Sequence, residues 1–419
     1  MATVKPFRGL RPSAAYAARI AALPYDVMDA DEARQITAGE PLSILRVTKA
    51  EVDLPPATDP YAPEVYAKAK ENLDWLVAQG YLAQDAAPCF YIYKQTMGGH
   101  TQIGLVAAAA VDEYEQGAIK KHEYTRPDKE QDRVNHIAVT GAQTGPVFLI
   151  HRADPAVGAL IARGLSRPPL YDFTSADGIG HALYLVDQAA DIAALEDAFS
   201  RVPALYIADG HHRSAAAARA RAACRQANPN HSGGEDYNRF LTVIFPHDQV
   251  RIMDYNRVVK DLAGRTPDAF LAAIGEKFVV SGAGPAAYKP NAAHTFGLYL
   301  AGRWYKLAAK PEICTAADPV ARLDVSILQD NLLAPILGIG DPRTDKRINF
   351  VGGIRGMEEL ARLVDSGKYA VAFALYPTAV DELMAIADAG AIMPPKSTWF
   401  EPKLRDAMVI HLTGCSYGC

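Results

Sequence analysis

The chain has 419 residues, of which 49% are hydrophobic and 22% are charged, so it is long enough for two or three cores and too apolar to be disordered. Its formal net charge of −5 argues against a protein that wraps nucleic acid or rests on anionic lipid, because both need a basic face. No apolar stretch reaches the roughly 20 residues of a membrane span, and the N-terminus lacks a signal-peptide core. We therefore expect a cytoplasmic protein without nucleic-acid or membrane partners.

The five cysteines are scattered along the chain and odd in number. This pattern favours reduced thiols over a disulfide framework. Cys415 and Cys419 have a C-x3-C spacing, but no second pair lies nearby. We therefore interpret these two residues as part of a frayed end rather than as a metal site.

The first regular elements predict a helix followed by a mixed sheet. Apolar residues recur at helical spacing over residues 62–79, which predicts an amphipathic helix there. The strand-like runs after it lie at 90–93, 103–111, 204–208, 240–245 and 250–254. Short runs of this kind favour a sheet of mixed direction over a repeating βαβ array.

The segment Lys120–Arg133 is rich in charge and contains two candidate site residues, His122 and Glu123. Glu123 stands beside His122 at the end of a strand-like region, where a carboxylate could act as a general base on a substrate alcohol. We accordingly take Glu123 as the candidate base and His122 as a candidate substrate contact. A solvent-exposed glutamate is the alternative.

A helix that begins at Pro127 would follow, and its first turns carry three basic residues. Arg126, Lys129 and Arg133 are then at positions i, i+3 and i+7, which places them on one face. Such a basic stripe could bind a nucleotide or a phosphorylated product. The alternative is a solvated helix with ion pairs between successive turns.

The most informative stretch is an apolar run that ends in Asp209-Gly210-His211-His212-Arg213-Ser214 and enters an alanine-rich helical segment. A strand that leads into a helix N-terminus offers free N–H groups and the positive end of the helix dipole, which suits a phosphate. Gly210 permits close approach, and Arg213 can contact phosphate oxygens in bidentate fashion. Asp209 would hold Mg²⁺ or orient a substrate hydroxyl. The alternative is a capping Asp209 followed by two surface histidines.

His211 and His212 do not suit a zinc pair. Adjacent residues point to different sides of the element that carries them, so both rings cannot easily bind one ion. We assign both histidines, with Gly210, Arg213 and Ser214, to phosphate binding instead.

From about residue 256 helices and strands alternate, which predicts a second α/β domain over 256–419. Its helices are expected at 267–278, 324–337 and 379–389, the last with Thr378 as N-cap. A proline-bounded loop near the end carries Lys396, Ser397 and Thr398, which could reach a phosphate or a substrate. A rigid structural turn is the alternative for this loop.

The chain lacks a P-loop, the protein-kinase motifs and a Gly-x-Gly-x-x-Gly after a strand, so a nucleotide must be held by other means. Four ordered blocks identify it as a member of a bacterial and archaeal family of unknown function: Pro24–Val27, Lys121–Arg133, Ala208–Arg213 and Met393–Thr398. His-Glu followed by Asp-Gly-His-His-Arg is also similar to free-serine kinases of the ParB/sulfiredoxin-like fold. Those enzymes phosphorylate L-serine to O-phosphoserine.

The resemblance implies an α+β fold, with a ParB/sulfiredoxin-like mixed-sheet core. We expect residues 1–255 to form the nucleotide-binding and catalytic region with an N-terminal helical segment, and 256–419 an additional C-terminal α/β domain. Glu123 would act on the serine hydroxyl, whereas Asp209 to Arg213 would hold the nucleotide phosphates and the metal. An insertion would account for the long spacing between the two motifs.

The expected function is that of a small-molecule kinase with Mg²⁺ and ATP or ADP, acting on a small polar metabolite, with L-serine as the best guess. A homodimer is left open. The alternative is a nucleotide-switched regulatory protein of the ParB type without kinase activity. A sulfiredoxin-like redox enzyme is disfavoured, because Cys224 stands about three helical turns beyond Arg213.

Overall fold

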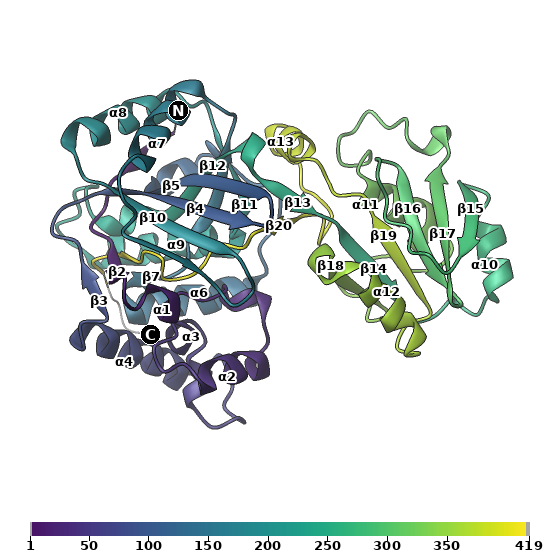
Figure 1. The fold of residues 1–419 in the computed structure, drawn as a ribbon, viewed down its shortest axis with the longest axis horizontal. Helices are drawn as coiled ribbons and strands as arrows, with labels where there is room; N and C mark the ends of the chain where they lie inside the picture. Colours follow the sequence, from purple (N-terminus) through teal and green to yellow (C-terminus); the bar gives the residue numbers. More distant parts are fainter. Residues whose placement is uncertain (1, 416–419) are drawn as a thin grey trace. The chain divides into compact units, whose positions relative to one another are not determined.

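A computed structural model describes residues 2–415 of the chain, which divide into two units (Figure 1). The first unit comprises Met1–Val250 together with Pro402–Cys419, and the second comprises Arg251–Glu401. The chain thus leaves the first unit once and returns to it near its end. Among the described helices, none combines the length and the apolar character that a membrane span needs.

Nine strands of the described chain form the main sheet of the first unit. They are β1 (Val4–Lys5), β4 (Phe90–Met97), β5 (His100–Ala110), β6 (Ile119–Lys120), β8 (Val147–His151), β9 (Tyr171–Thr174), β10 (Gly180–Val186), β11 (Leu205–Asp209) and β12 (Arg239–Pro246). Their order is β6-β11-β8-β12-β5-β4-β10-β9, with β1 also paired to β5. The β6–β11 and β8–β12 pairs are parallel and the others antiparallel, which confirms the predicted mixed sheet.

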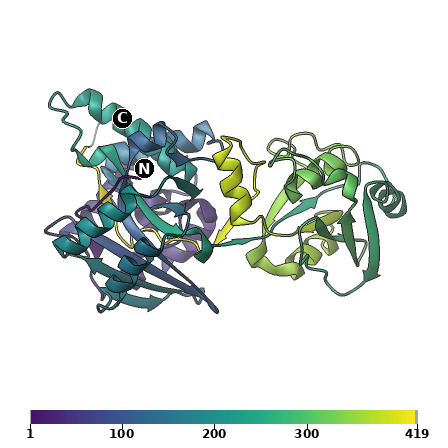
Figure 2. The same ribbon diagram turned by 90° about the horizontal axis from the view of Figure 1, so that it is seen from above.

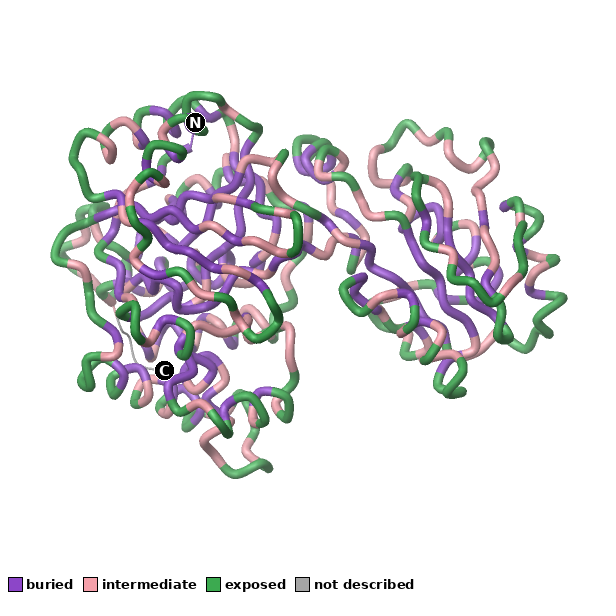
Figure 3. Tube along the Cα trace, viewed as in Figure 1, coloured by how far each residue is buried: buried purple, intermediate pink, exposed green. Residues whose placement is uncertain are grey.

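Helices cover this sheet, and the helices within the first 80 residues form a further layer with its own apolar core. They are α1 (Ala17–Ile20), α2 (Ala30–Ala38), α3 (Leu45–Thr48), α4 (Pro63–Ala78), α5 (Val111–Glu115), α6 (Pro127–Thr140), α7 (Pro155–Leu165), α8 (Ala189–Ser200) and α9 (His211–Ala227). Helix α7 packs against α8, β4 and β10, whereas α9 packs against β8, β12 and α6. The sheet is accordingly buried (Figure 3). The helices predicted at 62–79 and from Pro127 are confirmed as α4 and α6.

The ends of α6 follow from its sequence. Pro127 occupies the first turn, where its missing N–H costs no hydrogen bond. Gly141 ends the helix in the left-handed conformation, with φ of 64°, which glycine adopts without strain. Between them Val134 and Ile137 pack against Ala216 and Ala220 of α9. The helix that carries Lys129 and Arg133 is therefore fixed to the helix that begins with His211.

The C-terminal segment, Pro402–Cys415, lies in the first unit and is visible in yellow in both ribbon views (Figures 1 and 2). Its strand β21 (His411–Leu412) pairs with β7 (Ala142–Gln143), which follows α6 directly. Leu10 of β2 (Leu10–Pro12), which itself pairs with β3 (Leu82–Gln84), bridges to Ile410. Residues 404–411 are all buried. This segment is therefore part of the core of the first unit.

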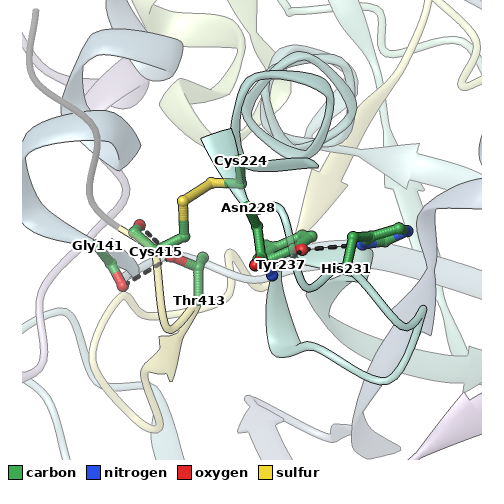
Figure 4. Close-up of a disulfide and its surroundings, with 7 residues drawn as sticks. All are labelled: Gly141, Cys224, Asn228, His231, Tyr237, Thr413 and Cys415. Atoms are coloured by element: carbon green, nitrogen blue, oxygen red, sulfur yellow. Dashed lines mark hydrogen bonds between the residues drawn. A yellow bond between two sulfur atoms is a disulfide. The ribbon is translucent and has the colours of Figure 1, made fainter. Parts of the chain in front are cut away.

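A disulfide joins Cys224 of α9 to Cys415 in the C-terminal segment (Figure 4). The prediction of reduced thiols is wrong for this pair, whereas Cys89 and Cys314 are free. The two bonded residues stand 191 positions apart, so no local spacing indicated the pairing. The prediction for Cys415 as a frayed residue is also wrong, and Cys419 lies outside the described residues.

Six strands, all within the described range, form an antiparallel sheet in the second unit, ordered β15-β17-β16-β19-β14-β18. The strands of this unit are β13 (Arg251–Met253), β14 (Tyr255–Val259), β15 (Phe278–Gly284), β16 (Thr295–Leu300), β17 (Arg303–Ala309), β18 (Ile348–Gly352), β19 (Val371–Leu375) and β20 (Trp399–Glu401). Its helices are α10 (Pro267–Ile274), α11 (Asp324–Leu328), α12 (Gly356–Asp365) and α13 (Val380–Asp388). Strand β13 pairs with β20 instead of joining the main sheet.

The predicted helices of this unit need three corrections. Helix α10 ends at Ile274, and Phe278 already begins β15. In place of one helix over 324–337, the structure has α11 over Asp324–Leu328, followed by a π-helical turn over Gln329–Leu333. Thr378 is not the N-cap of α13, because its hydroxyl donates to the Ser397 carbonyl oxygen (3.0 Å) and the cap position falls on the next residue.

The mixed α+β class is thus confirmed for the described chain. The division of the chain at residue 255 into two independent domains remains a prediction. In the structure the first unit extends to Val250 and takes in the chain again from Pro402. The segment that carries Lys403, Arg405 and Asp406 therefore belongs with β11 and α9.

Two buried histidines help to hold the first unit together. The Nε2 of His136 on α6 lies 3.0 Å from the Val47 carbonyl oxygen and donates to it. His181 on β10 contacts the Tyr93 hydroxyl (2.7 Å) and lies 3.3 Å from Nε of Arg405. Burial lowers the pKa of His136 to about 4 and that of His181 to about 3. Both rings are therefore neutral in the folded chain at pH 7.

Reduction of the disulfide should destabilise the first unit, because the bond closes a loop of 191 positions. A native disulfide of this loop length stabilises by about 2–5 kcal/mol, so we expect the apparent Tm of this unit to fall by about 5–15 °C. Thermal denaturation of Cys224→Ser and of the wild type with and without reductant measures this, with Cys314→Ser as the matched control. An unchanged Tm in Cys224→Ser would contradict the assignment.

The buried histidines predict an acid-sensitive fold. Their folded pKa values lie below the unfolded value of about 6.5, so their stabilising contribution is complete above pH 6.5 and is lost as the pH falls toward 4. His136→Gln keeps a donor for the Val47 carbonyl and removes one titrating ring. The urea midpoint should therefore fall less steeply between pH 6.5 and 4.5 in this variant. Identical pH profiles for the two proteins would refute the role of His136.

Candidate functional site

The parallel pairing of β6 with β11 brings the two sequence motifs together. Lys120 is in register with Tyr206, and both strands run in the same direction. Glu123 and Asp209 therefore each stand three residues beyond this register pair, at the same edge of the sheet. The motifs are close in space although they are far apart in the sequence.

Helix α9 begins directly at this edge. Gly210 is its N-cap and has a φ of 96°, a left-handed conformation that suits glycine. A Cβ at this position would lie 3.2 Å from Nε of Arg213 and 3.3 Å from the Cα of Val147, so the space is narrow. The helix runs for 17 residues, and its first turn directs backbone N–H groups and the positive end of its dipole outward. This end of α9 is suited to an anion.

Asp209, the last residue of β11, is the centre of an ion-pair network. Its carboxylate accepts a hydrogen bond from Nζ of Lys403 (2.9 Å) and lies 3.7 Å from the Arg213 guanidinium. Burial opposes ionisation of Asp209, but the charges of Lys403 and Arg213 outweigh it and hold its pKa well below the ordinary value. The carboxylate is therefore ionised, and the C-terminal segment supplies its main counter-ion.

Lys403 and Arg213 disfavour the predicted Mg²⁺ site at Asp209. Mg²⁺ is bound through oxygen ligands, and this carboxylate already faces two positive groups that would repel a third. The carboxylate therefore fits an orienting role better than a metal site.

Arg213 extends from α9 into a small cavity of about 30 Å³. Its Nη1 donates to the Pro146 carbonyl oxygen, whereas its Nε is buried without a hydrogen-bond partner. Tyr25, Arg133 and Asp406 also line this cavity, and Arg133 stacks on the Tyr25 ring with its guanidinium carbon 4.0 Å from the ring centroid. The cavity has room for a water molecule or a small polar group.

Asp406 is the acidic group of this cavity. It is 2% exposed, and its Oδ1 has no hydrogen-bond partner. Burial raises the pKa of Asp406 to about 6, against the opposing effect of Arg213. An unpaired oxygen and an unpaired guanidinium N–H in one cavity favour a ligand that carries both a donor and an acceptor.

On the other side of α9, His122, Glu123 and His211 form a cluster. One potential ligand atom from each of the three lies within 4.8 Å of the others. The rings of His122 and His211 are 4.5 Å apart and meet edge to face, at 87°. Burial lowers the pKa of His122 to about 4 and holds that of His211 far below its ordinary value. Both imidazoles are therefore neutral.

His211 and His212 point to different partners, as adjacent residues should. The Nε2 of His212 accepts a hydrogen bond from the backbone N–H of Arg126 (3.0 Å), which ties the start of α6 to α9. Burial lowers the pKa of His212. Ser214 is buried, and its hydroxyl donates to the carbonyl oxygen of His211 (3.0 Å), so it supports the helix from within.

The predicted basic stripe of α6 does not act as one surface. Arg126 is exposed and pairs with Asp128, whereas Lys129 donates to the Tyr61 hydroxyl (2.6 Å). Arg133 is buried, pairs with Asp132 and alone of the three reaches the cavity beside Arg213. Their common role in nucleotide binding stays a prediction, which the geometry favours for Arg133.

The loop with Lys396, Ser397 and Thr398 belongs to the second unit. Lys396 has a φ of 57°, and its carbonyl oxygen accepts a hydrogen bond from Arg257 (3.1 Å). The hydroxyl of Ser397 donates to the Pro394 carbonyl oxygen (2.6 Å). These local bonds fit a rigid turn, and the role of the loop in ligand binding stays a prediction.

Comparison with protein families gives one match over most of the chain: the family described as protein of unknown function (DUF1015) matches residues 4–326. A comparison with curated proteins gives no significant match.

Similar solved structures include a free serine kinase variant in complex with AMP, with 13% identity, coverage of 73% of this chain and 92% of that chain, and a TM-score of 0.34. A conserved hypothetical protein from Pyrococcus furiosus is 14% identical over 74% of this chain and 95% of its own, with a TM-score of 0.33. C-terminally truncated SbnI from Staphylococcus aureus is 9% identical over 72% and 87%, with a TM-score of 0.37. At these TM-scores the likenesses carry no weight for the fold or activity of this chain.

Loss of the Lys403 ammonium should destabilise the first unit, because Asp209 would keep only the longer contact with Arg213. We expect Lys403→Met to lower the free energy of unfolding by about 1–3 kcal/mol, less than for a fully buried pair because Asp209 is partly exposed. Lys403→Arg should retain most of the stability. Urea unfolding measures both, with Lys5→Met, from the exposed pair with Glu196, as the control. A Lys403→Met protein as stable as the wild type would show that the pair is dispensable.

Proposed function

The chain belongs to the family described as protein of unknown function (DUF1015). We propose that it is a phosphotransferase that moves a phosphoryl group from ATP or ADP to the hydroxyl of a small metabolite, with free L-serine as the best candidate. The observation that carries the proposal is the joining of the His-Glu and Asp-Gly-His-His-Arg motifs at one edge of the sheet by the β6–β11 pairing. Phosphoryl transfer depends mainly on positioning and charge stabilisation, which such an edge can supply.

The start of α9 would hold the nucleotide phosphates. Its first-turn N–H groups and dipole favour an anion, and Gly210 supplies the left-handed residue from which the helix starts. Arg213 has a buried Nε that no protein group satisfies, so a phosphate oxygen there would remove an uncompensated donor. The nucleotide would supply the phosphoryl group.

Glu123 would act on the acceptor hydroxyl. Its carboxylate reaches within 4.8 Å of the His211 ring, at the same helix end. In the proposed step the acceptor oxygen forms the new P–O bond and its proton passes to Glu123. The bond from the transferred phosphorus to the bridging oxygen of the donor breaks, and the nucleotide leaves with one phosphate fewer.

L-serine is the proposed acceptor because it is the substrate of the free-serine kinases that share the two motifs. Within the same proposal the first unit has a ParB/sulfiredoxin-like core, and the enzyme works in the cytoplasm. A regulatory protein without kinase activity is the alternative, and an absence of turnover would favour it.

The test is turnover of purified full-length protein with Mg²⁺, nucleotide and L-serine, followed by mass spectrometry of O-phosphoserine. We expect serine-dependent product with ATP or ADP. Failure to form any serine-dependent product with ATP, ADP or CTP would defeat the proposal for this acceptor.

Two variants separate the proposed roles. Glu123→Gln should lower kcat by about 10²–10⁴-fold and leave nucleotide binding intact, because it removes the group that takes the proton. Arg213→Lys should mainly weaken nucleotide binding, because an ammonium cannot replace the guanidinium fork. Glu196→Gln on α8 is the matched carboxylate control. Normal turnover by Glu123→Gln would remove Glu123 from the mechanism.

A further inference from the structure

We propose that His122, Glu123 and His211 form a binding site for one transition-metal dication of the zinc class. This site differs from the predicted Mg²⁺ at Asp209 and from the rejected pairing of His211 with His212. It takes the His122 imidazole and the Glu123 carboxylate from the segment after β6 and the His211 imidazole from the first turn of α9. The inference does not depend on the proposed phosphoryl transfer.

The distances suit such an ion. Potential ligand atoms of the three residues all lie within 4.8 Å of one another. Zinc bonds of about 2.0–2.2 Å in tetrahedral geometry place neighbouring ligand atoms roughly 3.4 Å apart. Closure around an ion therefore needs shifts of about 1 Å, which side-chain torsions can supply. Gly210 and the β6–β11 register fix the backbones from which these side chains extend.

His122 gives the independent indication of a ligand. Its side chain is buried, with 2% exposure, and neither Nδ1 nor Nε2 makes a hydrogen bond of normal geometry, although the backbone of Ile207 lies close to the ring. A buried imidazole with both nitrogens unpaired is costly, because no partner replaces the lost water. Coordination of an ion by one nitrogen would remove part of that cost.

The donor set selects the class of ion. Two imidazoles and one carboxylate suit Zn²⁺, Co²⁺ or Fe²⁺, whereas Mg²⁺ and Ca²⁺ prefer oxygen ligands throughout. Three protein ligands leave a fourth position for a water or alcohol oxygen, and Glu123 is the least buried of the three residues. A dication there would lower the pKa of the bound oxygen.

The site is tested by metal binding to tag-free, full-length protein that has been treated with a chelator and dialysed. Calorimetric titration with Zn²⁺ should give one saturable site per chain with a Kd of about 1 μM or tighter. Titration with Co²⁺ should give the intense visible absorption of a tetrahedral site. Absence of saturable 1:1 binding in the wild type would overturn the proposal.

Variants assign the binding to these residues. Glu123→Gln keeps the shape of a partly exposed side chain and should weaken Zn²⁺ binding at least tenfold, and His211→Ala should abolish it. Circular dichroism and the urea midpoint verify folding. His231→Ala is the matched control, because it removes another imidazole beside a carboxylate, 3.2 Å from Glu235. Retention of full affinity by Glu123→Gln, or its loss in His231→Ala, would place the ion elsewhere. Because binding is measured without nucleotide or serine, absence of phosphoryl transfer leaves this result unaffected.

Discussion

The candidate site depends on one parallel strand pair. β6 is only two residues long, yet its register with β11 sets Lys120 opposite Tyr206 and brings the segments that follow to one edge of the sheet. Without this pairing Glu123 would be a charged residue on a surface loop, and His211 would begin an ordinary helix. With it, α9 starts beside two neutral histidines and a carboxylate on one side and a buried arginine on the other.

The C-terminal segment completes this arrangement. Lys403 neutralises Asp209 at the end of β11, and Asp406 lines the cavity into which Arg213 extends. Cys415 is bonded to Cys224 on the same helix whose first turn is the proposed phosphate site. The segment is buried and joined to β7, so it holds these groups as part of the core. The disulfide therefore links the C-terminal segment to α9.

Local sequence signals predicted the elements that carry the motifs. Pro127 marked the start of α6, and the apolar run before Asp209-Gly210 marked β11 and the start of α9. Tyr25 stood in a block identified by family resemblance, although its contact with Arg133 was not predictable. Short-range patterns describe single elements well because caps and periodicity act within a few residues.

Contacts between distant segments were not predictable from one sequence. Nothing near Lys403 or Asp406 indicated that they lie beside Asp209 and Arg213, because the chain first forms the second unit and then returns. The prediction of reduced thiols was wrong for Cys224 and Cys415 for the same reason, because it rested on the number and spacing of the cysteines. The prediction that Arg126, Lys129 and Arg133 form one basic surface was wrong. Arg133 instead points inward, to Asp132 and Tyr25. In each case tertiary pairing decided which side chain faces which partner.

The central claim is that the N-terminus of α9, with Arg213, binds nucleotide phosphates. The most direct measurement is an experimental structure of the full chain with a non-hydrolysable ATP analogue. The account predicts phosphate oxygens within hydrogen-bond distance of the first-turn N–H groups of α9 and of the Arg213 guanidinium. Phosphates bound away from both groups would contradict it.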